Sequence, residues 1–294
     1  MNYHVPVLVQ ETMDGLNIVK GKRFIDATFG GGGHGMEIVK LGGDLLGIDV
    51  DPEAIEYAKE KLEIGCLKLD KTKTGNWKIV LGNFRDIEKI AKENGFDPVD
   101  GVLFDLGVSS HQLDVESRGF SYIFADAPFD LRLNQKEGVP ARDIINHENE
   151  EHLKTIIGTY GEEESCGRIA HALVHSRVKN PIRTTGDVLG IIEKITGEQK
   201  KNETASRVFQ AFRIEVNDEL NNIKKGLEHA EGLVKPGGRI AVISFHSLED
   251  RIAKQFFQKS EWKRITKKPI VPTVEEKMKN RRSRSAKLRI GEKL

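Results

Sequence analysis

The chain has 294 residues, of which 38% are hydrophobic and 31% charged, enough for one large domain or two ordinary ones with a sizeable core. It shows no apolar run near the roughly 20 residues of a membrane span and no signal-peptide pattern at its start, so we expect no membrane association. The two cysteines, Cys66 and Cys166, lack metal-ligand spacing. We therefore expect no disulfide and no metal, and a cytoplasmic location.

The net charge of +1 hides an uneven distribution. Residues 251–294 hold 15 Lys or Arg against four Asp or Glu, a net charge of +11, while the rest of the chain carries 31 basic and 41 acidic residues, a net charge of −10. A basic end on an acidic body is typical of a polyanionic partner such as nucleic acid. A solvated basic face is an equally good interpretation at this stage.

Strands and helices are expected to alternate in the first third of the chain. Strands are predicted at 23–28, 42–51, 77–84 and 99–110, and helices at 34–41, 52–62 and 85–95. The strands are nearly continuous apolar runs, which indicates a parallel sheet covered on both faces. The sequence therefore predicts a doubly wound α/β domain.

The alternation stops at about residue 110. Helices are expected at 150–161, 163–177 and 184–197, and one long helix at about 204–233, whose apolar stripe is typical of a core face. A strand predicted at 239–245 resumes the alternation of helices and strands. Strands predicted at 261–268 and 286–294 suit a hairpin at a sheet edge. We predict a discontinuous domain of residues 1–109 and 217–294, with an inserted helical domain of residues 110–216.

The glycine-rich stretch after the first strand suggests a nucleotide-type cofactor. Gly30, Gly32 and Gly35 match a dinucleotide-binding pattern, and Asp49 follows Gly30 by 19 residues, at the end of the second strand. A carboxylate at that distance suits ribose hydroxyls. NAD and S-adenosylmethionine both carry a ribose, so the glycines and Asp49 do not separate the two. The alternative for Asp49 is a helix N-terminal charge.

Asp26 distinguishes between these two candidate cofactors. A carboxylate just before the glycines would repel a pyrophosphate but would attract the ammonium and sulfonium of S-adenosylmethionine. Asp105, at the end of the fourth strand, adds negative charge to the same edge. We therefore favour S-adenosylmethionine, although Asp26 could simply cap a turn. Phe84 is either an adenine contact or a core residue.

Several motifs occur in a fixed order, among them "DATFGGGGHG", "GIDVDPEAI", "DLGVSSHQLD", "FQAFRIEVNDEL", "SFHSLEDR" and "NRRSRSAKLRI". Together with "HVPVLVQE" at the start, they resemble the RsmH (MraW) family of bacterial ribosomal RNA small subunit methyltransferases H over essentially the whole chain. The resemblance implies a class I S-adenosylmethionine-dependent methyltransferase fold with an inserted helical domain. It also implies methylation of N4 of a cytidine in 16S rRNA, in the decoding region of the small subunit. The cofactor contacts that it implies are Gly32, Gly33, His34, Asp49, Phe84, Asp105 and Gln112.

The chain departs from the family pattern at three places. Gly35 stands where the family usually has Ser, "FDLRL" (Phe129 to Leu133) replaces "LDMRM", and "ETASRV" precedes "FQAFRI". Asp130 and Arg132 are kept. We expect these departures to affect packing on the substrate side and to leave cofactor binding intact.

The fourth strand ends in "DLGVSS", without the prolines and aromatic residue found in many amino-methyltransferases. Asp105 or a nearby carbonyl is therefore the candidate acceptor of an N4 hydrogen, while His34 is more often a structural group than a base. His246 and Ser247 are candidates for contact with the target base or a phosphate, against a purely structural loop.

The basic end supplies candidate phosphate contacts at Arg281, Arg282, Arg284, Lys287 and Arg289, with activity expected to fall steeply with salt. Three other functions stay open from the residues alone. They are an NAD-dependent oxidoreductase, a non-catalytic rRNA-binding factor and a DNA cytosine-N4 methyltransferase.

Overall fold

The computed structural model describes residues 6–67 and 74–294, with side chains described for 6–60 and 74–294. His4 and Val5 of the "HVPVLVQE" motif and the side chain of Cys66 lie outside the described residues. The chain forms two compact units, the first of residues 1–109 and 220–294 and the second of residues 110–219.

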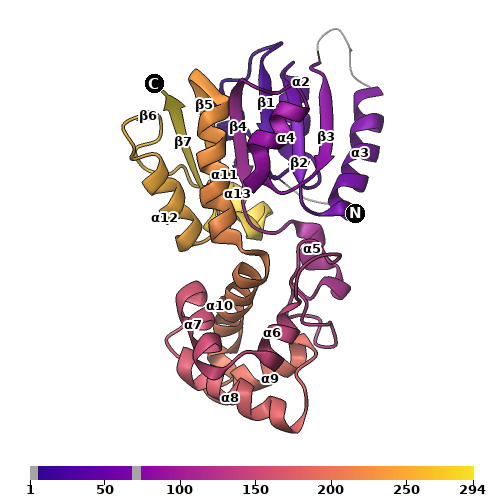
Figure 1. Cartoon of the computed structure of the whole chain (residues 1–294), viewed down its shortest axis with the longest axis vertical. Helices are drawn as coiled ribbons and strands as arrows, with labels where there is room; N and C mark the ends of the chain where they lie inside the picture. The colour runs from indigo at the N-terminus through magenta and orange to yellow at the C-terminus, as the bar shows by residue number, and fades with distance from the viewer. Residues whose placement is uncertain (1–5, 68–73) are drawn as a thin grey trace. The chain divides into compact units, whose positions relative to one another are not determined.

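The first unit is built on a seven-stranded sheet with the order β3-β2-β1-β4-β5-β7-β6 (Figure 1). β1 to β5 are parallel to one another, whereas β7 is antiparallel to both of its neighbours, β5 and β6. The strands are β1 (Arg23–Asp26), β2 (Asp44–Asp49), β3 (Trp77–Leu81), β4 (Val99–Asp105), β5 (Val234–Ser244), β6 (Trp262–Arg264) and β7 (Lys287–Lys293). The predicted mostly parallel α/β sheet and its closing hairpin are confirmed.

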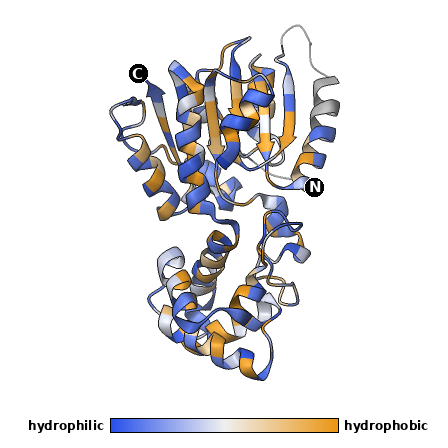
Figure 2. Cartoon of the chain, viewed as in Figure 1, coloured by the Kyte–Doolittle hydropathy of each residue, from blue (hydrophilic) through white to orange (hydrophobic). Residues whose placement is uncertain are grey.

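Helices cover both faces of this sheet. α1 (Val9–Leu16), α2 (Gly33–Lys40) and α3 (Pro52–Leu67) contribute to one buried apolar cluster. α4 (Ile87–Glu93), α11 (Glu219–Leu233) and α12 (Ser247–Phe256) contribute to the other. The central strands are apolar along their length, as Figure 2 shows, because both of their faces are buried.

The second unit is helical. It contains α5 (Ser110–Asp114), η2 (Glu116–Arg118), α6 (Ala141–His147), α7 (Glu150–Gly161), α8 (Cys166–Lys179), α9 (Thr185–Thr196) and α10 (Glu198–Asn217). Phe129 packs edge-to-face against Phe209 and Phe212, with ring centroids 5.0 and 5.6 Å apart. Within the described part of this unit the extended pairing is limited to one isolated bridge, between Pro128 and Thr184.

The single helix predicted at 204–233 is wrong, because two helices occupy that range. α10 ends at Asn217 and α11 begins at Glu219, and Asp218 between them has a left-handed φ of 50°. The Asn217 carboxamide donates to the carbonyls of Leu131 and Arg213 and accepts from the Leu133 amide. These bonds hold the end of α10 against the segment 131–133. The apolar periodicity continues across the break, so periodicity could not reveal it.

Several helical segments were not predicted. In the first unit these include α1, α12 and the stretch α13 (Val274–Lys279) followed by η3 (Arg281–Ser285), in what the sequence suggests is a polar connection; in the second unit they include α5, η2 and α6. The Glu276 carboxylate of α13 accepts a hydrogen bond from the Leu8 amide at 2.9 Å, which ties the start of α1 to the C-terminal segment. None of the helices in the described ranges is long and apolar enough to cross a bilayer.

Candidate active site

Three carboxylates lie at the carboxyl ends of neighbouring strands in the first unit. Asp26 ends β1, Asp49 ends β2 and Asp105 ends β4, and β1 lies between the other two strands in the sheet. In open parallel sheets this edge is where ligands bind. We call these three aspartates, together with His34, the acidic cluster.

Asp26 is almost completely buried, with 1% of its surface exposed. Burial raises the pKa of its carboxyl to about 7; the nearby His34 opposes this rise, and the charges of Asp105 and Asp49 add to it. Its Oδ1 also accepts a 3.3 Å hydrogen bond from the Thr28 amide, so the turn-capping role is real. A cation beside this carboxyl would favour its ionised form.

Asp49 organises the glycine stretch. Its Oδ2 accepts a hydrogen bond of 2.6 Å from the Gly30 amide, and its Oδ1 accepts one of 2.8 Å from the Asp51 amide. Burial raises the pKa of the Asp49 carboxyl to about 6, against these amide bonds, which lower it. Each carboxylate oxygen can accept two hydrogen bonds, so these amides are compatible with ribose hydroxyls as further donors.

Asp105 is held at two points. Its amide donates to the Thr28 hydroxyl at 2.6 Å, and its Oδ2 lies 3.3 Å from Nδ1 of His34. His34 is 3% exposed, and its Nε2 lies 2.9 Å from the carbonyl oxygen of Val7. Thr28 and Val7 could not be predicted from the sequence, because their contacts depend on how separate segments meet in space.

The glycine stretch turns sharply into α2. Gly32 is the N-cap residue with a φ of 73°, in the left-handed region that glycine adopts most easily. A Cβ on Gly33 would come within 2.9 Å of the Pro6 ring. A Cβ on Gly35 would come within 2.2 Å of the Phe29 ring and 3.0 Å of Leu45. Phe29 thus fills the space that a larger residue at position 35 would need.

Comparisons with known proteins decide the family. The model of the MraW methylase family matches residues 1–294. The chain belongs to the MraW methylase family. It is 44% identical to a ribosomal RNA small subunit methyltransferase H from Clostridium botulinum (strain 657 / Type Ba4), with 99% of each chain covered. It is 45% identical to the protein of that name from Brevibacillus brevis, covering 99% of this chain and 98% of the relative.

Family membership confirms the predicted methyltransferase and its cofactor, S-adenosylmethionine, and decides against an NAD-dependent oxidoreductase. Among solved structures, an rRNA methylase from Streptococcus thermophilus is similar, with a TM-score of 0.47, 10% identity, and coverage of 99% of this chain and 98% of that one.

The other predicted cofactor residues of this methylase lie in different places. Phe84 begins η1 (Phe84–Asp86), is half-buried and packs edge-to-face on Phe104 with ring centroids 5.6 Å apart, so it belongs at least in part to the core. Gln112 lies on α5 in the second unit.

His246 and Ser247 lie at the start of α12. His246 is its N-cap residue, and the buried Glu249 accepts hydrogen bonds from the amides of Phe245 and His246 at 2.7 and 3.3 Å. Glu249, the first acidic residue of "SFHSLEDR", therefore stabilises the start of α12. Contact of His246 and Ser247 with substrate stays a prediction.

The basic C-terminal residues fall into two groups. Arg281, Arg282 and Arg284 are exposed on η3, where the buried Ser283 anchors the turn through its hydroxyl, which donates to the Asn280 carbonyl at 2.8 Å. We call these three residues the arginine turn. Arg289 is buried and Lys287 is half-buried, and both pair with Asp250, at 2.6 and 3.3 Å, so their contact with phosphates stays a prediction.

The "FDLRL" segment is structural. The Asp130 carboxylate accepts hydrogen bonds from Nε and Nη2 of Arg132, both at 2.8 Å. This interaction raises the pKa of the Arg132 guanidinium against a smaller opposing effect of burial. The fully buried Arg118 donates to the carbonyl of Leu133 at 2.7 Å, and Leu131 has a left-handed φ of 65°. The segment thus forms a braced loop within the second unit.

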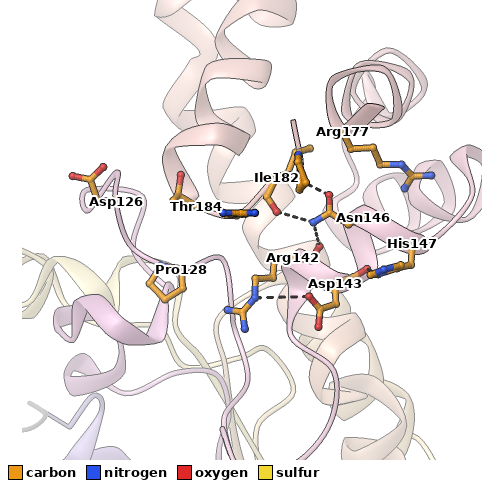
Figure 3. A pocket seen from close by; sticks show the side chains of 11 residues that line it. Asp126, Pro128, Arg142, Asp143, Asn146, His147, Arg177, Ile182 and Thr184 are labelled. Carbon is orange, nitrogen blue, oxygen red and sulfur yellow. Dashed lines mark hydrogen bonds and ion pairs between the residues drawn. The ribbon is translucent and has the colours of Figure 1, made fainter. Parts of the chain in front are cut away.

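A pocket of about 580 Å³ lies in the second unit (Figure 3). Its lining includes Arg142, Arg177 and Arg183 against Asp126 and Asp143. Arg177 is fixed in place because its Nη1 donates to the carbonyls of Ile145 and Glu148, whereas Arg183 has an exposed side chain. The lining therefore combines an anchored cation with an accessible one.

Proposed function

We propose that this methylase transfers a methyl group to N4 of a cytidine in 16S rRNA, in the decoding region of the small ribosomal subunit. The names of relatives with 44–45% identity over 99% of the chain support an rRNA substrate. The structural observation that carries the proposal is the Asp105 carboxylate, held at the carboxyl end of β4 beside the glycine turn.

The acidic cluster fits the cofactor. Asp26 and Asp105 offer carboxylates to the ammonium and sulfonium groups of S-adenosylmethionine, and Asp49 offers oxygens to its ribose. The left-handed turn at Gly32 lets the backbone approach a ligand closely. When bound, the cofactor supplies a methyl group on a positively charged sulfur that is a good leaving group.

We expect Asp105 to make the target amine a better nucleophile. The N4 amine of cytosine is a weak nucleophile because its lone pair is delocalised into the ring. A carboxylate that accepts one N4 hydrogen favours a pyramidal nitrogen, whose lone pair can then point at the methyl carbon. Holding the two reactants in line contributes most of the acceleration, and Asp105 provides this orientation.

The substrate must be held by other parts of the chain. We propose that the second unit, with its arginine-containing pocket, and the arginine turn bind RNA phosphates, which position the substrate without specifying its sequence. The target cytidine must leave its stack to reach the acidic cluster, as in other base-modifying enzymes. An rRNA substrate also implies action in the cytoplasm.

The test uses the full chain with methyl-labelled S-adenosylmethionine and three acceptors: small ribosomal subunits, naked 16S rRNA and cytosine-containing DNA. Mass spectrometry of the nucleosides should find the label in N4-methylcytidine from one or both RNA samples. Label in DNA alone would favour the DNA methyltransferase alternative, and no transfer to any acceptor would support a non-catalytic binding factor.

A further inference from the structure

The His34 ring is fully engaged by the protein on both of its nitrogens. It lies on the second residue of α2, is almost completely buried, and contacts the Val7 carbonyl through Nε2 and Asp105 through Nδ1. The ring therefore has no nitrogen left for the cofactor or for use as a general base. Any contact of His34 with the cofactor must come from its backbone.

The partners of the ring fix where its protons are. A carbonyl oxygen can only accept, so Nε2 must donate to Val7. A neutral ring would then turn the lone pair of Nδ1 toward the carboxylate of Asp105, which is repulsive. The 3.3 Å contact consequently requires a further proton, carried by Nδ1 or by the Asp105 carboxyl.

The surrounding charges favour the proton on the ring. Burial lowers the pKa of His34, but the hydrogen bond and charge of Asp105, the charge of Asp26 and the Val7 carbonyl outweigh it, so the net shift is upward. The positive end of α2 opposes a charged ring, and this effect is small beside nearby carboxylates in a buried site. Asp49 at the end of β2 adds a third acid to the same edge.

We propose that His34 is a positioning residue that donates from Nδ1 to the Asp105 carboxylate and so orients it to accept a hydrogen from the reacting amine. This inference rests on the proposed amine methylation. During transfer the nitrogen lone pair forms the new bond to the methyl carbon, and the carbon–sulfur bond breaks with its electron pair going to sulfur. The amine then carries a positive charge and loses one proton, which the Asp105 carboxylate, oriented by His34, is placed to take.

Two conservative substitutions separate this role from a purely structural one. The side-chain nitrogen of Asn matches Nδ1, so His34→Asn keeps a donor toward Asp105 but loses the Val7 contact. The side-chain nitrogen of Gln matches Nε2, so His34→Gln keeps the Val7 contact but loses the donor to Asp105. We expect His34→Gln to lower kcat at least tenfold and His34→Asn to retain more activity, and calorimetry with S-adenosylhomocysteine would check that the cofactor pocket persists in both. The reverse order of kcat values would overturn the proposal.

A second measurement is independent of activity. Nitrogen-15 NMR of the ligand-free full chain should show both His34 ring nitrogens protonated at pH 7, and the signal should revert to a neutral ring in Asp105→Asn. A neutral His34 ring in the unsubstituted protein would refute the inference even if rRNA methylation is intact. Failure of wild-type methyl transfer, with a charged ring still observed, would instead refute the proposed function.

Discussion

The acidic cluster and the arginine turn use charge in opposite ways. Asp26 and His34 are 1% and 3% exposed; burial raises the pKa of Asp26 to about 7, and the neighbouring carboxylates raise the pKa of His34 against the effect of burial. Arg281, Arg282 and Arg284 are exposed on a short turn. Charges in a buried site interact strongly over short distances, whereas exposed charges are screened by water and salt.

This difference predicts how the two regions respond to mutation. In the acidic cluster each carboxylate has its own partners, so single substitutions should have large and distinct effects. In the arginine turn the residues should contribute similar small amounts that depend on ionic strength.

Asp105→Asn should have the largest effect on methyl transfer. The amide keeps the shape of the side chain but cannot act as the ionised acceptor, so we expect kcat to fall by about 10²- to 10⁴-fold. Single-turnover assays with small subunits would measure this loss, and calorimetry with S-adenosylhomocysteine would check that the pocket persists. A kcat within tenfold of wild type would contradict the role of Asp105.

Asp26→Asn should alter the pH dependence of cofactor binding. The Asp26 carboxyl has a pKa of about 7 in the ligand-free protein, and a cationic cofactor favours its ionised form. The affinity of the wild type should therefore rise with pH up to about 7 and level off above it, with proton release on binding. Asp26→Asn should bind more weakly above pH 7, with a flatter profile.

Calorimetry in buffers of different ionisation enthalpy measures that proton release, and the exposed Asp14→Asn is a suitable control.

Because the folded-state pKa of Asp26 is raised, its ionisation costs stability as pH increases from 4 to 7, by about 1.4 kcal/mol per pH unit. Asp26→Asn should thus raise the melting temperature of the ligand-free protein at pH 8 but not at pH 4. Equal changes at both pH values would argue against a raised pKa.

Gly35→Ser tests the packing beneath the acidic cluster. The new Cβ would meet the buried Phe29 ring, so we expect a loss of about 1–3 kcal/mol in the free energy of unfolding. Denaturant titration would measure it, with Gly232→Ser as control, since a Cβ there meets nothing within 4 Å. Removing the ring in Phe29→Ala should make the serine less costly. If Gly35→Ser lowers the free energy of unfolding equally with and without the Phe29 ring, contact with that ring is not the cause of the loss.

Single alanine substitutions in the arginine turn should have the smallest effects, about two- to fivefold in RNA affinity. Each should also make the logarithmic dependence of affinity on salt shallower by roughly one unit. Arg289→Ala provides the contrast, because it removes a partner of Asp250 and should lower stability instead. Equal salt effects at Arg284 and Arg289 would break the distinction between the two groups.

The sequence predicted what depends on local pattern. Continuous apolar runs revealed the central strands, and acids at their ends revealed Asp26, Asp49 and Asp105, because the ends of parallel strands meet at one edge. Contacts between segments that are distant in the chain could not be predicted from local pattern. The Val7 carbonyl reaches His34 across 27 positions, and the Thr28 hydroxyl reaches the Asp105 amide across 77.

Residue type also could not separate structural from accessible charges. Arg284 and Arg289 lie five positions apart in the same basic stretch, yet the first is exposed and the second is paired with Asp250. The break at Asp218 was missed for a similar reason, since one left-handed residue leaves the apolar period intact. The role of Gly35 became clear only from the position of the Phe29 ring.

The proposed methylation is tested most directly by mass spectrometry of 16S rRNA nucleosides from cells with and without the gene. We expect N4-methylated cytidine to disappear from the decoding region when the gene is absent. It should return with the wild-type chain but not with Asp105→Asn. An unchanged amount of the modified nucleoside in cells without the gene, or full restoration by Asp105→Asn, would contradict this expectation.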